Sequence, residues 1–118
     1  MQLALNCDPF GRVVGTIAHR GAKSTVTASD PASAIADLQE AARSAVDHGH
    51  GECFWHEATG DYRWLFRRDA NTMRIAILWS AGTLTGWEDR FWAECDAAEF
   101  RSTIDAAIQS CHTLDAQN

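Results

Sequence analysis

The sequence predicts an α+β fold in which an antiparallel β-meander sheet of five to seven strands carries two helices on one face, in the order β-β-(β)-α-β-β-β-β-α. Three observations predict it. Apolar residues alternate in short segments joined by turns, two segments have helical spacing with N-terminal caps, and nine of the eleven aromatic residues lie between Phe54 and Trp92. With 118 residues, 46 % of them hydrophobic, the chain fits a single domain over 1–118.

The N-terminal quarter predicts a hairpin and a further short strand. Extended patterns at 2–7 and 12–19 flank a turn at 8–11 that contains proline and glycine. The segment 24–27, which is rich in β-branched residues, then suits a short third strand. Its pattern is shorter than that of the other predicted strands, so this strand is optional in the element order.

The first helix is predicted to begin at Asp30-Pro31, because an aspartate cap followed by proline satisfies the free amides of a helix start. Its apolar residues recur every three to four positions, and the glycines within 48–51 end it. The buried stripe comprises Ile35, Leu38, Ala42, Ala45 and Val46.

From Glu52 the apolar period changes to two, which predicts strands near 52–57, 61–69, 72–80 and 86–95 joined by short loops. Alternation assigns one side of each strand to the core. The core side includes Met73, Ile75, Ile77, Trp79, Trp87, Asp89 and Phe91, together with Trp55 and Trp64. The opposite side of the last strand carries Glu88, Arg90, Trp92 and Glu94.

The last helix is predicted to start after Asp96, with Glu99 completing a reciprocal capping box, and to run to about Cys111 or His112. Its buried stripe is formed by Phe100, Ile104, Ala107, Ile108 and Cys111.

No motif predicts catalysis, a metal site or a cofactor. His48, His50, Glu52, Cys53 and His56 are metal-binding residue types, but Cys53 and His56 point to opposite faces of one strand. Cys53 is interpreted as a buried structural cysteine. Glu88 and Glu94 stand about 20 Å apart, too far for a glycosidase pair. Phosphate-binding glycine loops and nucleophile elbows are absent from the sequence.

Charge and cysteine usage restrict the classes of partner. Ten basic and 16 acidic residues give a net charge of −6, which disfavours nucleic acid as a direct ligand. The four cysteines are widely spaced and no export signal precedes them, so we expect reduced thiols and a cytoplasmic protein. No apolar run is long enough to span a bilayer. A monomer or a weak homodimer is expected.

The exposed side of the sheet is the feature most indicative of function. Arg63, Arg67, Arg74, Glu88, Arg90 and Glu94 are expected there, with Phe54, Leu65 and Trp92 among them. One interpretation is a solvated face of cross-strand ion pairs. The other is a protein-contact surface, because tryptophan and arginine are enriched at interface hot spots. A small-ligand pocket between helices and sheet is a third possibility.

Segments 61–68 (DYRWLFRR) and 73–79 (MRIAILW), followed by a polar-aromatic strand and a closing helix with Phe100 and Ile104, resemble small bacterial immunity proteins that accompany polymorphic or contact-delivered toxins. The resemblance implies a cytoplasmic antitoxin without chemistry of its own. Such an inhibitor binds its cognate toxin and blocks the active site or the substrate cleft.

We therefore expect a non-enzymatic inhibitor whose contact residues include Trp92, Arg90, Glu88, Glu94, Arg63 and Arg74. A scaffolding domain of a phage or secretion system is the alternative, and a small enzyme or ligand-binding domain is a third. If the contact surface is the acidic rim formed by Glu88, Glu94, Asp96, Glu99 and Asp105, the toxin is expected to be basic. If it is the arginine row, the toxin is expected to be acidic.

Overall fold

The structure is a computed structural model that describes residues 1–82 and 86–117. Its elements are β1 (Gln2–Cys7), β2 (Val13–His19), β3 (Ala22–Ala28), α1 (Pro31–His48), β4 (His50–Glu57), β5 (Gly60–Asp69), β6 (Thr72–Ser80), β7 (Glu88–Asp96) and α2 (Ala97–Gln117). The predicted α+β class and element order are confirmed, including the third strand. The last helix is longer than predicted, because it continues past Cys111 to Gln117.

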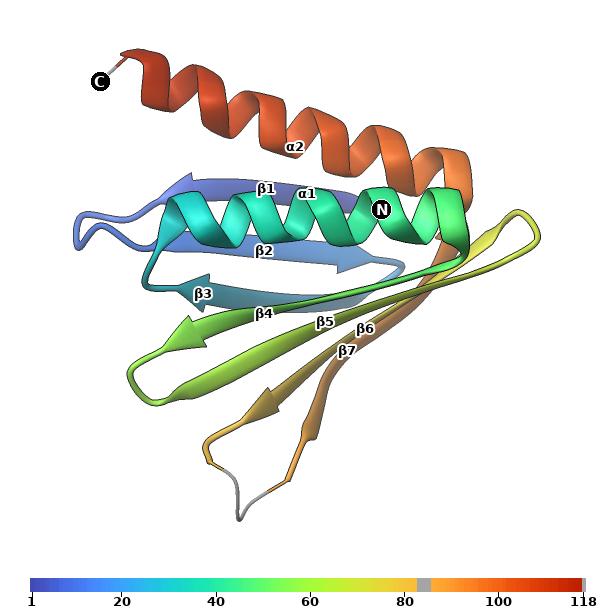
Figure 1. The fold of residues 1–118 in the computed structure, drawn as a ribbon, viewed down its shortest axis with the longest axis horizontal. Coiled ribbons are helices and arrows are strands. Elements are labelled where there is room, and N and C mark those ends of the chain that lie inside the picture. Colours follow the sequence, from blue (N-terminus) through green and yellow to red (C-terminus); the bar gives the residue numbers. More distant parts are fainter. Residues whose placement is uncertain (83–85, 118) are drawn as a thin grey trace.

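The strands form two antiparallel sheets, β1-β2-β3 and β4-β5-β6-β7, in which sequence neighbours pair throughout (Figure 1). This division was not predicted from the sequence. It occurs where α1 separates β3 from β4, and the two sheets meet through Ser29, whose amide donates to the His56 carbonyl at 3.0 Å. Figure 1 shows the four-stranded sheet fanning away from the three-stranded one, with α1 and α2 beside each other.

The predicted start and end of α1 are confirmed. The Asp30 side chain accepts a hydrogen bond from the Ser33 amide at 3.3 Å, and Pro31 occupies the first turn. At the other end Gly49 adopts φ 92°, a left-handed conformation that glycine takes without strain, and its amide donates to the Ala45 carbonyl at 3.0 Å.

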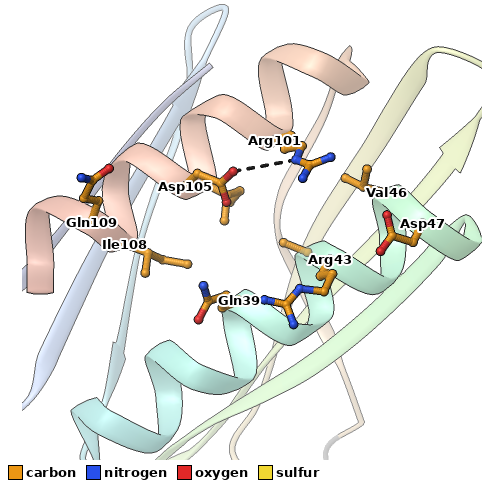
Figure 2. A pocket seen from close by; sticks show the side chains of 10 residues that line it. Gln39, Arg43, Val46, Asp47, Arg101, Asp105, Ile108 and Gln109 are labelled. Atoms are coloured by element: carbon orange, nitrogen blue, oxygen red, sulfur yellow. Dashed lines mark ion pairs between the residues drawn. The ribbon is translucent and has the colours of Figure 1, made fainter.

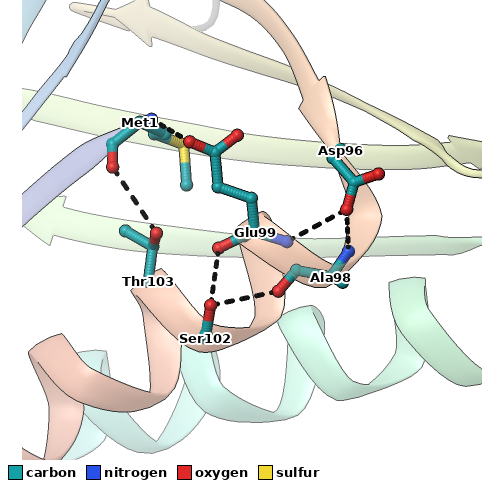
Figure 3. Close-up of polar contacts among 6 residues, drawn as sticks. All are labelled: Met1, Asp96, Ala98, Glu99, Ser102 and Thr103. Carbon is teal, nitrogen blue, oxygen red and sulfur yellow. Dashed lines mark hydrogen bonds and ion pairs between the residues drawn. The ribbon is translucent and has the colours of Figure 1, made fainter.

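At the start of α2, Asp96 acts as a cap but Glu99 does not (Figure 3). Asp96 Oδ1 accepts from the amides of Ala98 at 2.9 Å and Glu99 at 3.3 Å, as predicted. The prediction that Glu99 completes a reciprocal capping box is wrong, because its Oε1 instead accepts a hydrogen bond from the Met1 ammonium at 2.7 Å. That hydrogen bond and the positive charge lower the pKa of Glu99. The first strand is thereby attached to the first turn of the last helix.

The core lies between the two sheets and the helices. Trp55 and Trp64 are fully buried with ring centroids 5.0 Å apart, and Trp55 Nε1 donates to the Ala34 carbonyl of α1 at 3.1 Å. Helix α1 crosses β4 so closely that a Cβ on Gly51 would overlap the Ala41 carbonyl. Glycine is therefore required at position 51 for the helix to pack on the sheet.

Candidate protein-contact surface

The four-stranded sheet has one covered and one uncovered side. The inner side contributes Trp55, Trp64, Phe66, Ile75 and Ile77 to the core. We call the opposite side the outer face. It carries three rows of facing residues, which are His50–Arg67–Arg74–Glu94, Glu52–Leu65–Ala76–Trp92 and Phe54–Arg63–Leu78–Asp89.

Exposed aromatic side chains gather on this outer face. Four large hydrophobic residues are exposed in the described part of the chain: Phe10 at 83 %, Trp92 at 62 %, Trp87 at 43 % and Phe54 at 37 %. Phe10 lies in the turn between β1 and β2, whereas the other three belong to the outer face. Large apolar side chains concentrated on one surface are typical of a contact site.

The prediction that Trp87 serves the core is wrong, because β7 contains a bulge. The pairing shifts between Ile77, which faces Phe91, and Leu78, which faces Asp89, so that no residue of β6 faces Arg90 in the register. One extra residue in a strand reverses the alternation beyond it. Asp89 therefore shares the outer side of Leu78, Glu88 stands opposite Trp79, and Trp87 is turned toward the outer face.

At one end of the outer face, Trp87 forms a cluster with Phe54 and Arg63. The two rings are 6.0 Å apart between centroids, and the Arg63 guanidinium carbon lies 5.8 Å from the Phe54 centroid and 5.6 Å from the Trp87 centroid. Arg63 Nε also donates to Glu52 Oε2 at 2.9 Å. The guanidinium is thus held by two rings and a carboxylate, which presets the local shape of the surface.

The six predicted contact residues are only partly brought together. Arg63, Arg74, Trp92 and Glu94 lie in the outer rows, and Arg74 Nε is 3.3 Å from Glu94 Oε1 and Nη2 is 3.8 Å from Asp69 Oδ2. Arg90 occupies the bulge and pairs with Glu88 at 3.4 Å. Trp87 was not among the predicted contact residues, because alternation gives no sign of the bulge that reorients it.

The acidic rim is less available than the sequence indicates. Glu99 binds the N-terminal ammonium, and Asp105 lies 3.8 Å from Arg101. Asp96 is occupied with capping α2. Glu88 and Glu94 pair with Arg90 and Arg74, so all five predicted rim carboxylates have partners within the molecule.

The residues considered for chemistry are separated. Cys53 is buried under α1, and this burial raises the pKa of its thiol to about 12, so it is a poor nucleophile. His56 is exposed on the opposite side of β4, with Nδ1 2.6 Å from Asp61 Oδ1. Within residues 1–82 and 86–117, no three histidine, cysteine or acidic residues are grouped as metal ligands would be.

A cleft of about 390 Å³ opens between α1 and α2, on the helix side of the molecule (Figure 2). Its apolar floor includes Ala42, Ile104 and Ile108. At its rim Arg101 lies 3.8 Å from Asp105, and Arg43 lies 3.6 Å from Glu40. Both ion pairs join residues of the same helix, so neither links α1 to α2 across the cleft, which Gln39, Asp47 and Gln109 also line.

The outward side of the three-stranded sheet provides an internal comparison. Its central row is Ala4–Thr16–Thr25, and its neighbours are Asn6–Val14–Thr27 and Gln2–Ala18–Lys23. Apart from Val14, these residues are alanines or polar residues, and none is aromatic. Two sheets of one chain thus expose very different surfaces, and only the four-stranded one has the composition of an interface.

Comparison with models of protein families, with curated proteins and with solved structures gives no match to this chain. Neither helix, over the residues described, is long and apolar enough to cross a membrane.

Proposed function

We propose that this protein is a non-enzymatic inhibitor that binds a protein partner through its outer face, and that the partner is a bacterial toxin whose active site or substrate cleft it blocks. The observation that carries the proposal is the concentration of Trp87, Trp92 and Phe54 on the side of the four-stranded sheet that no helix covers. Aromatic anchors surrounded by arginines are the residues that contribute most to binding at protein interfaces.

Two further observations support binding over catalysis. The outer face is a broad surface formed by four strands that are hydrogen-bonded to one another. Such a sheet can bind a partner with little change in its backbone. The only cysteine considered as a nucleophile, Cys53, is buried on the other side of the sheet. The toxin as partner follows from the resemblance of 61–68 and 73–79 to immunity proteins.

Co-expression with the protein encoded by the neighbouring gene tests the proposal. We expect that protein alone to arrest growth, that co-expression restores growth, and that the two proteins co-purify in equal amounts. A neighbour that is harmless alone but still co-purifies would favour the scaffolding alternative. A toxic neighbour that neither binds nor is neutralised would contradict the proposal.

Matched variants locate the contact. Trp87→Ala with Trp92→Ala removes two outer-face aromatics, whereas Phe10→Ala removes an exposed aromatic from a remote turn. We expect the first variant to lose protection and the second to keep it. Equal protection by both variants would contradict the placement of the contact on the outer face.

A further inference from the structure

The outer face contains a basic hollow next to Trp92. It has a volume of about 720 Å³, and its lining includes Arg67, Arg68, Arg74, Leu65 and Trp92. Three of the ten basic residues of an acidic chain thus line one hollow, Arg67 and Arg74 from the outer face and Arg68 from the alternate position that faces Met73. The feature requires a physical explanation, because the net charge of the molecule is −6.

The arrangement of these arginines is unfavourable without a ligand. Arg67 and Arg74 face each other directly across β5 and β6, and His50 faces Arg67 from β4. Like charges at directly facing positions destabilise a sheet. Arg74 is compensated by Glu94 and Asp69, whereas Arg67 and Arg68 have no ion pair with any residue that the structure describes.

Next to the arginines the hollow is apolar. Leu65 and Ala76 face each other on β5 and β6, and Trp92 faces Ala76 from β7. A guanidinium binds a carboxylate through two parallel hydrogen bonds, and a neighbouring aromatic wall suits an adjacent apolar side chain. The hollow therefore combines a place for carboxylates with a place for an apolar residue.

We propose that this hollow binds an acidic segment of the partner protein, in which Arg67 and Arg74 receive carboxylates and Trp92 covers an apolar residue between them. The inference rests on the proposed function and assigns the partner's contact segment an acidic, rather than basic, character. A nucleic acid fits less well, because its regular phosphates would pass Glu52, Glu94 and Asp69 beside the hollow.

The hollow can be tested with a defined probe. A blocked hexapeptide of sequence GDELDG is titrated into isotope-labelled protein, with GNQLNG as its uncharged match and an oligo-dT strand as the nucleic-acid probe. We expect GDELDG to shift the NMR signals of Arg67, Arg74, Ala76 and Trp92 saturably, and GNQLNG to bind about tenfold more weakly or worse. Equal binding of both peptides, no saturable shift with GDELDG, or tighter binding of oligo-dT at the same signals would overturn the inference.

Variants separate this inference from the proposed function. Arg67→Glu is compared with Lys23→Glu, which makes the same charge change at an exposed position of β3. Arg67→Glu is expected to abolish peptide binding and to weaken capture of the toxin at least about tenfold, and Lys23→Glu to change neither. If Arg67→Glu captures the toxin normally while the Trp87 and Trp92 double variant does not, the inference that the hollow binds an acidic segment is wrong and the inhibitor proposal stands. If no toxin is found, the inhibitor proposal fails, and the peptide titration still shows whether the hollow binds an acidic segment.

Discussion

The two faces of the four-stranded sheet use the same residue types for opposite purposes. On the inner face, Trp55 and Trp64 are fully buried and contact each other. On the outer face, Trp92 is largely exposed and Trp87 lies against an arginine. Tryptophan on the inner face contributes to folding, whereas on the outer face it adds little to stability and leaves a large apolar area in water.

This difference shows that the aromatic residues of one sequence segment do not all have the same role. A strand exposes alternate residues to different environments, so neighbours in the sequence can serve the core and a partner. Substitutions on the two faces are therefore expected to differ in their effects on stability, binding and reactivity.

The largest effect is expected for the inner face. Trp55→Ala removes a fully buried ring and its bond to the Ala34 carbonyl, and should lower the free energy of unfolding by about 4 kcal/mol. Urea unfolding followed by circular dichroism measures this loss. Trp92→Ala is the matched control and should change stability by less than about 0.5 kcal/mol. Similar losses for both variants would remove the distinction between the two faces.

The second effect concerns the contact of α1 with the inner face. Gly51→Ala would push a methyl group into the Ala41 carbonyl, and should cost about 3 kcal/mol because helix and strand must separate. Gly82→Ala is the control, since a Cβ there meets nothing within 4 Å. Thermal unfolding of both variants provides the measurement, and an unchanged melting temperature for Gly51→Ala would show that the helix packs less closely than described.

The third effect is confined to the outer face. Trp92→Ala with Arg90→Ala should leave the melting temperature nearly unchanged and weaken partner binding by about 2 kcal/mol or more, as measured by calorimetry. Thr16→Ala with Thr25→Ala makes a matched change on the outward side of the other sheet and should leave binding unchanged. Unfolding of the Trp92 and Arg90 variant would instead assign these residues a structural role.

The smallest effect concerns reactivity. With the pKa of its thiol raised to about 12, Cys53 should stay protonated at pH 8 and fail to react with a thiol reagent in the folded protein. Cys7 is exposed and should react under the same conditions. Mass spectrometry of the labelled peptides distinguishes the two, and rapid labelling of Cys53 would indicate an open path to the inner face.

Much of the fold could be predicted because its signals are local. Asp30-Pro31 and Gly49 mark the ends of α1 by backbone chemistry alone, and Asp96 marks the start of α2. The period of two in 72–80 placed Met73, Ile75 and Ile77 in the core, where all three are buried. Each of these signals acts over a few residues.

The errors concern interactions between distant residues. Glu99 was expected to complete a capping box, but the Met1 ammonium, 98 residues away, binds it instead. The bulge at Arg90 depends on how β7 pairs with β6, and it moved Trp87 from the predicted core to the outer face. Trp92, Arg74, Phe54 and Arg63 were therefore expected on the outer face, whereas Trp87, which contacts Phe54 and Arg63 there, was not.

The sequence by itself determined the element order, the helix caps and most of the core, because propensity, capping and apolar period are properties of short segments. Only the tertiary structure decided that seven strands form two sheets, which side of the four-stranded sheet is uncovered, and that Arg67 faces Arg74 beside Trp92. Strand register and layer packing decide these features, since both depend on contacts between segments far apart in the chain.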